Sequence, residues 1–295
     1  MNRRLSTVAV VAVLALTGCS DDAASPGAQP TATSSESSAT PSASPSPTPD
    51  ASPSAATVRV PVYYLGGTQA RPVLYREFRS VPKPLDTISA AVEAMLHVAP
   101  QDSDYYSLWP AATTLKSVAT SGTTATVDLS SDARSVTTSR VNEVASLQQL
   151  VHTVTAADTS IKTVALRFDG TTKPTLWGRV DTTTPLGRNA SIDTIAPVWV
   201  IEPAPGSTVS RTFTVKGTAA VFEATVSWEV TRPGSTTQLA HGFVNASQGA
   251  PGRGDYTVSV TLPAGTTGDV VFTAWEDSAE DGSRLFPDSK TYRVS

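Results

Sequence analysis

The sequence contains a single cysteine, Cys19, and three histidines among its 295 residues. One cysteine excludes an internal disulfide, and once it is acylated it also excludes a thiolate metal site. Apolar cores alone must therefore hold the folded part together. Basic residues are not in excess either, because 22 lysines and arginines stand against 26 aspartates and glutamates, for a net charge of −4. Without a basic stripe, we expect no nucleic-acid partner.

The apolar run near the N-terminus is too short to span a membrane. Residues 8–16 are uninterrupted Val, Ala and Leu, whereas a membrane-spanning helix needs roughly 20 apolar residues. The run follows Arg3 and Arg4 and precedes a small-residue site, Leu-Thr-Gly-Cys at 16–19. This layout is typical of a secretory signal peptide, here residues 1–18.

The tetrad that ends at Cys19 resembles the lipobox of bacterial lipoproteins. The resemblance implies cleavage between Gly18 and Cys19, and a diacylglyceryl group on the Cys19 thiol. Two acyl chains, such as palmitate, hold a protein on a membrane far more stably than one. We therefore expect a lipid-anchored protein on the extracytoplasmic face of the cell membrane. The alternative is a secreted protein with an unmodified Cys19.

Residues 19–57 combine the lipidated cysteine with a tether made almost entirely of Ser, Thr, Ala and Pro. Such a segment buries too little apolar surface to offset the entropy of ordering, so it is expected to be disordered. Its charged residues are all acidic, which favours extension. In polyproline form it would reach at most roughly 120 Å. The tether is interpreted as a spacer between the membrane and the folded domains, and sugars on Ser and Thr are an alternative role.

Residues 58–186 show the pattern of a mixed α/β domain. Two extended runs, at 57–65 and 71–81, flank a break at Gly66-Gly67. A helix is predicted from a cap at Asp86 or Thr87 to a stop before Pro100. Further on, a strand at 125–129 alternates apolar and polar residues, and a strand at 161–168 is stopped by Asp169-Gly170. Between these two strands a second amphipathic helix is predicted, and its apolar stripe contains Val141, Val144, Leu147, Leu150, Val151 and Val154.

Several short motifs in this region resemble the GerMN domain. They are VYYL at 62–65, VDLS at 127–130, LVHTVT at 150–155 and LWG at 176–178. That family is named for sporulation and spore germination proteins and is widespread in envelope lipoproteins. The resemblance implies a small α/β module, related to ring-building motifs of envelope assemblies, with no conserved catalytic constellation.

Residues 190–295 are predicted to form an all-β sandwich. Seven short runs of alternating or apolar residues are separated by turn signals. Because no cysteine pair is available, Trp228 or Trp275 is expected to fill the centre. VFEATV at 221–226 and SAEDGS at 278–283 resemble the immunoglobulin-like domain of bacterial spore germination proteins. The predicted fold class is therefore multidomain, with an α/β (α+β) GerMN-like domain followed by an all-β immunoglobulin-like sandwich, after a disordered N-terminal tether.

The residue types needed for catalysis show no familiar arrangement. His97, His152 and His241 lack metal-ligand spacing, so each is expected to be structural or exposed. The sequence contains no G-x-S-x-G elbow and no glycine-rich phosphate loop before a helix. Glu77, Glu93 and Glu143 are interpreted as solvated. We predict neither an enzyme nor a cofactor.

A calcium loop is considered at Asp277, Asp281 and Asp288, which fall at positions one, five and twelve of a calcium-binding pattern. Ala279 stands at the third position, however, and strands are predicted on both sides. An acidic turn stabilised by Asp281-Gly282 is the preferred interpretation, so no metal site is predicted.

A candidate binding loop contains Tyr105, Tyr106 and Trp109, after the first helix. Exposed loops on a rigid scaffold often carry binding residues, and these rings could form a groove for a sugar or a peptide. Packing in the core is the alternative that we favour.

The predicted function is that of a non-catalytic, membrane-anchored scaffold or assembly factor whose partner is another envelope protein. The rival is a ligand-binding or sensing module for cell-wall glycan or a small molecule, with residues 105–109 as its mouth. A hydrolase is the third hypothesis. A concave aromatic pocket would favour the rival, and an exposed strand edge or flat apolar patch would favour the scaffold.

Overall fold

Two folded domains follow one another in the computed structural model, which describes residues 57–82, 86–136 and 138–295. Both belong to one unit, residues 53–295. The predicted signal peptide, Gly18, Cys19 and the tether up to residue 56 lie outside the described residues. Of the helices in the described part of the chain, none has the length and apolar character needed to cross a membrane.

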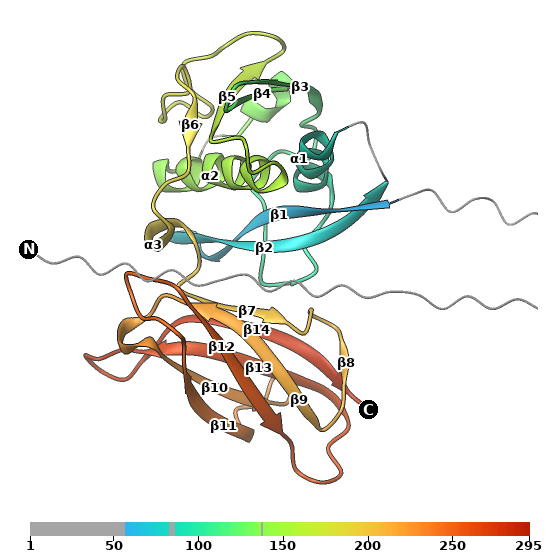
Figure 1. Cartoon of the computed structure of the whole chain (residues 1–295), viewed down its shortest axis with the longest axis vertical. Helices are drawn as coiled ribbons and strands as arrows, with labels where there is room; N and C mark the ends of the chain where they lie inside the picture. Colours follow the sequence, from blue (N-terminus) through green and yellow to red (C-terminus); the bar gives the residue numbers. More distant parts are fainter. Residues whose placement is uncertain (1–56, 83–85, 137) are drawn as a thin grey trace, which may run out of the picture. The chain divides into compact units, whose positions relative to one another are not determined.

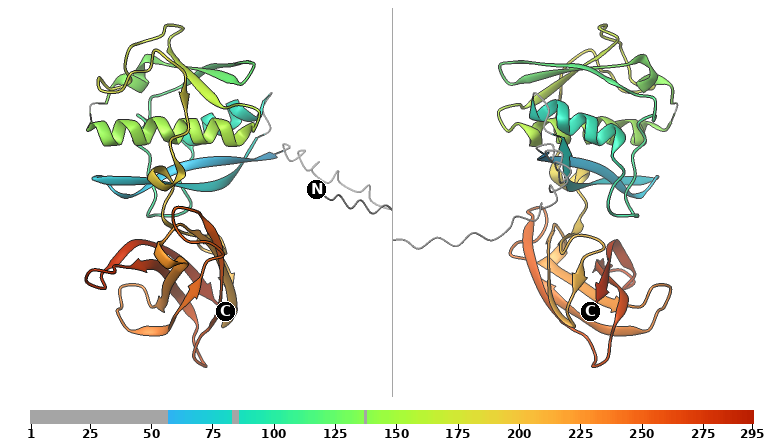
Figure 2. Two further views of the ribbon diagram at one scale, coloured as in Figure 1. Left: turned by 60° about the vertical axis from the view of Figure 1, so that its left-hand side comes forward. Right: turned by 90° about the vertical axis from the view of Figure 1, so that its right-hand side faces the viewer.

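The first domain has three layers (Figures 1 and 2). A long antiparallel hairpin of two strands forms one outer layer, and a four-stranded sheet of order β3-β4-β5-β6 forms the other. The helices α1 and α2 pack between them. The elements are β1 (Thr57–Thr68), β2 (Arg71–Pro82), α1 (Thr87–His97), β3 (Leu115–Ser121), β4 (Thr124–Leu129), η1 (Ser131–Arg134), α2 (Arg140–Ala157), β5 (Thr163–Phe168) and β6 (Leu186–Gly187).

Helix α1 begins and ends where its sequence signals predict. Asp86 is the N-cap, and its side chain accepts a hydrogen bond of 2.7 Å from the backbone N–H of Ser89. This cap satisfies one of the backbone donors that a helix N-terminus leaves unpaired. The helix ends at His97, three residues before Pro100.

Helix α2 differs from its predicted amphipathic pattern. Val141 is 50% exposed, and Val144 is only partly buried. The polar side of the helix is buried instead, including Gln149 and Thr153, which are both 0% exposed. The reason is the layered arrangement, because a helix between two sheets has little surface left for water.

The predicted break at Gly66-Gly67 is wrong, since β1 continues to Thr68. Gly66 is needed for packing rather than for ending a strand. A Cβ atom at this position would lie 2.5 Å from a ring carbon of Tyr75 and 3.2 Å from the ring of Tyr105. Gly67 has a φ of +72°, a conformation that favours glycine.

The second domain is a sandwich of a five-stranded sheet, of order β11-β10-β13-β14-β8, and a three-stranded sheet, of order β12-β9-β7. The seven predicted strands are confirmed, and a short eighth, β8, is added. A short helix, α3 (Ser191–Thr194), precedes the sandwich. The other elements are β7 (Val198–Glu202), β8 (Thr208–Val209), β9 (Thr212–Ala219), η2 (Phe222–Ala224), β10 (Thr225–Thr231), β11 (Gln238–Asn245), β12 (Gly254–Thr261), β13 (Gly268–Asp277) and β14 (Arg284–Val294).

Neither candidate tryptophan fills the centre of the sandwich. Phe272 and Tyr292, both 0% exposed, lie in its hydrophobic core. Trp228 is partly buried and stacks on Phe272 with ring centroids 5.8 Å apart. Trp275 is buried but lies outside this core. Large aromatic rings on the inner faces of the strands thus supply the filling that a disulfide gives other immunoglobulin domains.

Candidate functional site

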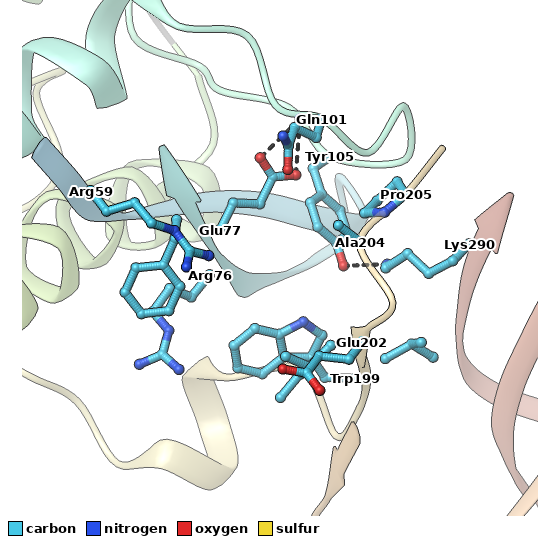
Figure 3. A pocket seen from close by; sticks show the side chains of 13 residues that line it. Arg59, Arg76, Glu77, Gln101, Tyr105, Trp199, Glu202, Ala204, Pro205 and Lys290 are labelled. Atoms are coloured by element: carbon cyan, nitrogen blue, oxygen red, sulfur yellow. Dashed lines mark hydrogen bonds between the residues drawn. The ribbon is translucent and has the colours of Figure 1, made fainter. Parts of the chain in front are cut away.

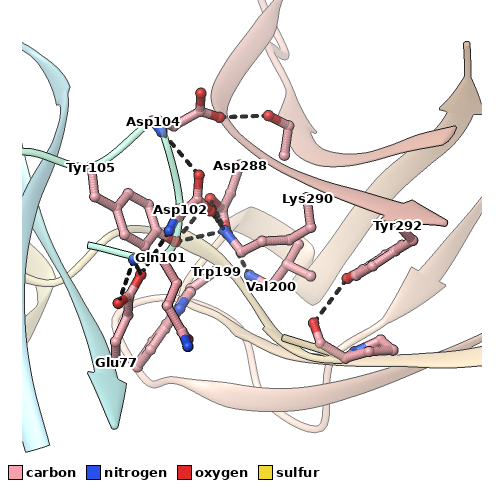
Figure 4. Close-up of polar contacts among 12 residues, drawn as sticks. Glu77, Gln101, Asp102, Asp104, Tyr105, Trp199, Val200, Asp288, Lys290 and Tyr292 are labelled. Carbon is pink, nitrogen blue, oxygen red and sulfur yellow. Dashed lines mark hydrogen bonds and ion pairs between the residues drawn. The ribbon is translucent and has the colours of Figure 1, made fainter. Parts of the chain in front are cut away.

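The two domains meet at a buried polar cluster, here called the latch, made of Asp102, Tyr105, Asp288 and Lys290. Lys290 on β14 forms ion pairs with Asp102 in the loop after α1 and, at 2.8 Å, with Asp288 on its own strand. The same ammonium donates to the Tyr105 hydroxyl at 2.7 Å, and that hydroxyl lies 3.1 Å from Asp288. Figure 4 shows how these side chains converge from both domains.

Backbone donors hold the latch in place on either side. Glu77 of β2 accepts hydrogen bonds of 2.8 Å from the N–H of Gln101 and 3.0 Å from the N–H of Asp102. In the second domain, the N–H of Val200 donates to Asp288 at 2.6 Å. Charge-assisted bonds of this kind are stronger than neutral ones. They fix the loop of the first domain and the strand of the second at the junction.

Asp288 and Lys290 of the latch are ionised at neutral pH. Burial raises the pKa of Asp288 from 3.8 to about 6, and the Lys290 ammonium opposes part of that shift. Burial alone would lower the pKa of Lys290, but the carboxylates of Asp288 and Asp102 outweigh burial, and the pKa is raised above 10.5. Burial also raises the pKa of the Tyr105 hydroxyl well above 10, so it stays protonated. The interface therefore contains a buried ammonium that is held between two buried aspartate side chains.

A cleft of about 540 Å³ opens beside the latch (Figure 3). Its walls come from β1 and β2 of the first domain and from β7 and the following loop of the second. Arg59 and Arg76 line it from the first domain, and Trp199 and Glu202 line it from the second. Lys290 reaches it from the latch.

Two arginines and two aromatic rings alternate along this cleft. The Arg59 and Arg76 guanidinium carbons lie 5.1 Å and 4.9 Å from the centroid of the Phe78 ring, and the Arg76 carbon lies 5.7 Å from that of Trp199. These distances fall within the range of cation–π attraction. Trp199 in turn meets Tyr75 edge-on at 6.4 Å. The rings thus position the two guanidinium groups.

The predicted binding loop is divided between two roles. Tyr105 joins the latch and stacks on Tyr75 with centroids 4.2 Å apart, and Trp109 packs against Trp177 at 6.0 Å. Both Tyr105 and Trp109 are only 6% exposed. Tyr106 is partly buried, and its backbone pairs with Leu65 of β1. The loop packs the domain, and the structure does not bring the three rings together as one open face.

The three aspartates of the calcium pattern have separate partners. Asp277 accepts hydrogen bonds from the Trp275 indole at 2.7 Å and from the Ser227 hydroxyl. Asp281 lies in an exposed turn and accepts from the Ser283 N–H at 3.0 Å. Asp288 belongs to the latch. In the described ranges, no three His, Cys, Asp or Glu side chains are placed to hold a metal ion.

The histidines also lie apart. His97 is exposed and pairs with Glu93 one turn earlier at 3.5 Å, and His241 is exposed on the edge strand β11. His152 is buried on α2, and its ring lies 5.1 Å from that of Tyr63.

Two acidic residues interpreted as solvated are buried. Glu77 is 8% exposed, and Glu143 is 0% exposed. Glu143 accepts hydrogen bonds from the backbone N–H groups of Trp177 at 2.9 Å, Arg179 at 3.0 Å and Val180 at 3.2 Å. The interpretation was wrong because the partners are backbone groups of distant loops, which side-chain periodicity does not reveal.

Sequence reasoning missed the arginines of the cleft and the charges of the latch. One signal was available in the final strand, where Asp288 and Lys290 share the alternation of the buried Tyr292 and Val294. Two charges in a buried register require partners from elsewhere in the fold.

Comparison with known families agrees with this two-domain arrangement. Residues 61–174 match the family model described as sporulation and spore germination, and residues 197–283 match the model described as the immunoglobulin-like domain of bacterial spore germination. The chain therefore has the GerM-like germination domain architecture. The latch thus joins its GerMN domain to its immunoglobulin-like domain, and the predicted family and the predicted order of an α/β (α+β) domain followed by an all-β sandwich are confirmed.

Solved structures resemble parts of this chain. The first GerMN domain of GerM from Bacillus subtilis is 22% identical, with a TM-score of 0.38, and the match covers 45% of this chain and 98% of that one. The tandem GerMN domains of the same protein are 19% identical, with a TM-score of 0.38, over 48% of this chain and 49% of theirs. A protein from Clostridium perfringens, described provisionally as a lipoprotein, is 22% identical, with a TM-score of 0.33, over 44% and 87%. No curated protein matches the chain.

Proposed function

We propose that this protein is a non-catalytic, lipid-anchored envelope protein that presents its two domains in a fixed orientation to another envelope protein. The observation that carries the proposal is the latch. Its ion-pair partners Asp102, Asp288 and Lys290 have side chains that are only 1–5% exposed. Burying charges between two domains is costly unless the geometry is kept. Such a rigid junction is best suited to presenting one composite surface that is built from both domains.

The contacts of the carboxylates near the cleft support a structural role for these side chains rather than a role in hydrolysis. Glu77 is engaged by two backbone N–H groups and by Arg79 at 3.1 Å, and Asp288 by Lys290, Tyr105 and the Val200 N–H. A general acid or base must reach a substrate proton. These side chains already have protein partners. The two matched families are named for sporulation and germination and not for a reaction.

Two surfaces of the immunoglobulin-like domain suit a protein partner. Strand β11 lies at the edge of its sheet, and Phe243 on this strand is 74% exposed. Phe222, before β10, is 68% exposed. Edge strands and exposed large apolar side chains are typical of protein interaction sites. The buried rings of Tyr105 and Trp109 give less support to a glycan-binding mouth at residues 105–109.

The first experiment is in-cell crosslinking of the tagged full-length protein, followed by mass spectrometry of the detergent-solubilised envelope. We expect one recurrent protein partner. Its recovery should fall in Lys290→Met, which breaks the latch, and stay unchanged in Lys116→Met. Lys116 is a matched control because it forms a 3.7 Å ion pair with Asp169, both side chains are about half exposed, and neither lines the cleft.

A second variant at the junction keeps the test interpretable if Lys290→Met misfolds. Ser289 donates to Asp104 across the same junction at 2.6 Å, on the exposed side of the latch. Ser289→Asp places two carboxylates opposite one another without disturbing a core, and Ser259→Asp adds the same charge on the exposed face of β12. Recovery of wall fragments alone, with no protein above background, would overturn the proposed function. So would equal recovery from all four variants.

The lipid anchor needs its own test. Feeding cells a clickable palmitate analogue should label the wild-type protein in the membrane fraction. Cys19→Ser should remove the label and release the protein from that fraction. Unchanged labelling of Cys19→Ser would contradict the anchor.

A further inference from the structure

The charges that line the cleft are not balanced. Glu77 is neutralised by Arg79 at 3.1 Å, and Glu202 by Lys216 at 3.2 Å. Lys290 is neutralised inside the latch. The second latch aspartate adds one carboxylate there, but both aspartates are buried and already have partners: Asp102 contacts Lys290 and the Asp104 N–H, and Asp288 contacts Tyr105 and the Val200 N–H. Every charged lining residue except two thus has a partner.

Arg59 and Arg76 are the two exceptions. Among the described residues, neither guanidinium lies within ion-pair distance of a carboxylate. The Nε of Arg76 is shielded from solvent and has no hydrogen-bond partner in the described part of the chain. Both groups are held over Phe78, at 5.1 Å and 4.9 Å from its centroid. A protein with a net charge of −4 therefore presents two positioned and uncompensated cations in one cleft.

A pair of guanidinium groups recognises carboxylate or phosphate oxygens, because its N–H groups form a planar fork. Saccharide stacking is disfavoured here. The guanidiniums lie over the Phe78 ring, and Trp199 is only 7% exposed and is itself covered by Arg76 at 5.7 Å. An anionic glycan would lack the open aromatic face that sugar rings need.

The strands that flank the cleft point to a peptide. β2 belongs to a two-stranded sheet, so among the described strands its edge opposite β1 has no partner strand, and β7 is the edge strand of its own sheet. The chain already uses the open edge of β2, because Ile195 pairs in parallel with Leu74 and the Ala196 N–H donates to the Leu74 carbonyl at 3.1 Å. Unpaired strand edges bind extended peptides through backbone hydrogen bonds, and side-chain pockets add specificity.

We propose that the interdomain cleft binds an extended acidic peptide segment of a protein partner. Arg59 and Arg76 hold the carboxylates of that segment, and its backbone pairs with the edge of β2 beyond Leu74. The inference rests on the proposed function and names the chemistry of the partner.

The test uses a fluorescein-labelled peptide of alternating Glu and Val, with its Gln-for-Glu version as a neutral control. Anisotropy is measured with the full-length protein in detergent. We expect the Glu peptide alone to bind, and more weakly as salt is added. In Arg59→Gln/Arg76→Gln the Kd should rise by at least about tenfold.

The matched control is Arg167→Gln/Arg211→Gln. It removes two exposed arginines that do not line the cleft and changes the net charge equally. Its Kd should change by less than about twofold. Circular dichroism of both double variants checks their folding, and Arg59→Lys/Arg76→Lys should bind at an intermediate level because it keeps the charge and loses the fork.

Two further ligands separate the alternatives. A version of the Glu peptide with alternate N-methyl groups keeps every carboxylate but cannot pair with a strand edge, so it should bind more weakly. Poly(glycerol phosphate) should bind more weakly than the Glu peptide, because it cannot pair with a strand edge. Equal losses in the two double variants, or arginine-dependent binding of the phosphate polymer without the peptide, would overturn the inference. Failure of the peptide alongside a recurrent crosslinked partner would leave the proposed function standing.

Discussion

Lys290 on the last strand pairs with Asp102 in the first domain, although their side chains are only 3% and 5% exposed. Ion pairs at a surface contribute little to stability, but a buried one makes the loss of either partner costly. Here the same lysine also neutralises Asp288. The contact therefore connects the folding of one domain to the position of the other.

Lys290→Met is expected to lower the free energy of unfolding by about 3–5 kcal/mol, because it leaves Asp102 and Asp288 buried without a cation. Denaturant unfolding measures this loss. The surface variant Lys216→Met should cost about 0–1 kcal/mol. Adding Asp102→Asn and Asp288→Asn to Lys290→Met should restore part of the stability. Similar losses of unfolding free energy in the Lys290 and Lys216 variants would show that the latch contributes no more to stability than a surface ion pair does.

Glu143→Ala is expected to free the loop that follows β5. The carboxylate accepts hydrogen bonds from the N–H groups of Trp177, Arg179 and Val180, which would lose their partner. The expected loss is about 3 kcal/mol. Hydrogen exchange should accelerate at those three amides before it changes elsewhere.

The control for Glu143→Ala is Glu93→Ala. Glu93 is on α1, its side chain is 49% exposed, and among the described residues it pairs only with His97. Its removal should cost less than about 0.5 kcal/mol. Unchanged exchange at the amide of Trp177 in Glu143→Ala would refute the bracing role of this carboxylate.

Local sequence signals predicted the elements of the fold well. The cap at Asp86, the turn at Asp169-Gly170 and the alternation at 125–129 each depend on residues close together in the chain. Such signals act through backbone geometry and through the two faces of a strand. They are therefore readable without the tertiary structure.

The candidate site could not be predicted in the same way. Lys290 binds Asp102 and Tyr105 from the other end of the chain, and Glu143 binds backbone groups that carry no side-chain signature. The arginines of the cleft, Arg59 and Arg76, resemble ordinary exposed strand residues in the sequence. Only the fold reveals that other charges near them are already paired.

Gly66→Ala is expected to destabilise the first domain through its aromatic packing. A Cβ atom would approach Tyr75 ring carbons to 2.5 Å and 2.7 Å, and the buried stack of Tyr75 on Tyr105 would have to move. Overpacking of this kind costs about 1–3 kcal/mol. Gly187→Ala is the control, since its Cβ would meet nothing closer than 3.9 Å. Equal thermal midpoints for the two variants would contradict the packing role of Gly66.

His152 is expected to make the protein less stable in acid. Both ring nitrogens are buried and lack hydrogen-bond partners among the described residues. Burial, with a smaller contribution from the Arg188 charge, lowers the pKa of His152 from 6.5 to about 3. Between these values the unfolded chain binds a proton at His152 and the folded chain does not. The contribution of neutral His152 to the free energy of unfolding is therefore fully present above pH 6.5, and it is lost as the pH falls towards 3.

His152→Leu removes this dependence without breaking a hydrogen bond. Urea unfolding at about pH 7 and about pH 5 should show the wild type losing about 2 kcal/mol more than the variant, since each pH unit contributes about 1.4 kcal/mol. Asp288 has the opposite effect on stability: its raised pKa makes the folded state bind the proton more tightly than the unfolded chain, so its protonation below pH 6 favours the folded state. Asp288 is present in both proteins, so the difference between them isolates His152. Parallel losses in the two proteins would mean that His152 accepts its proton without unfolding.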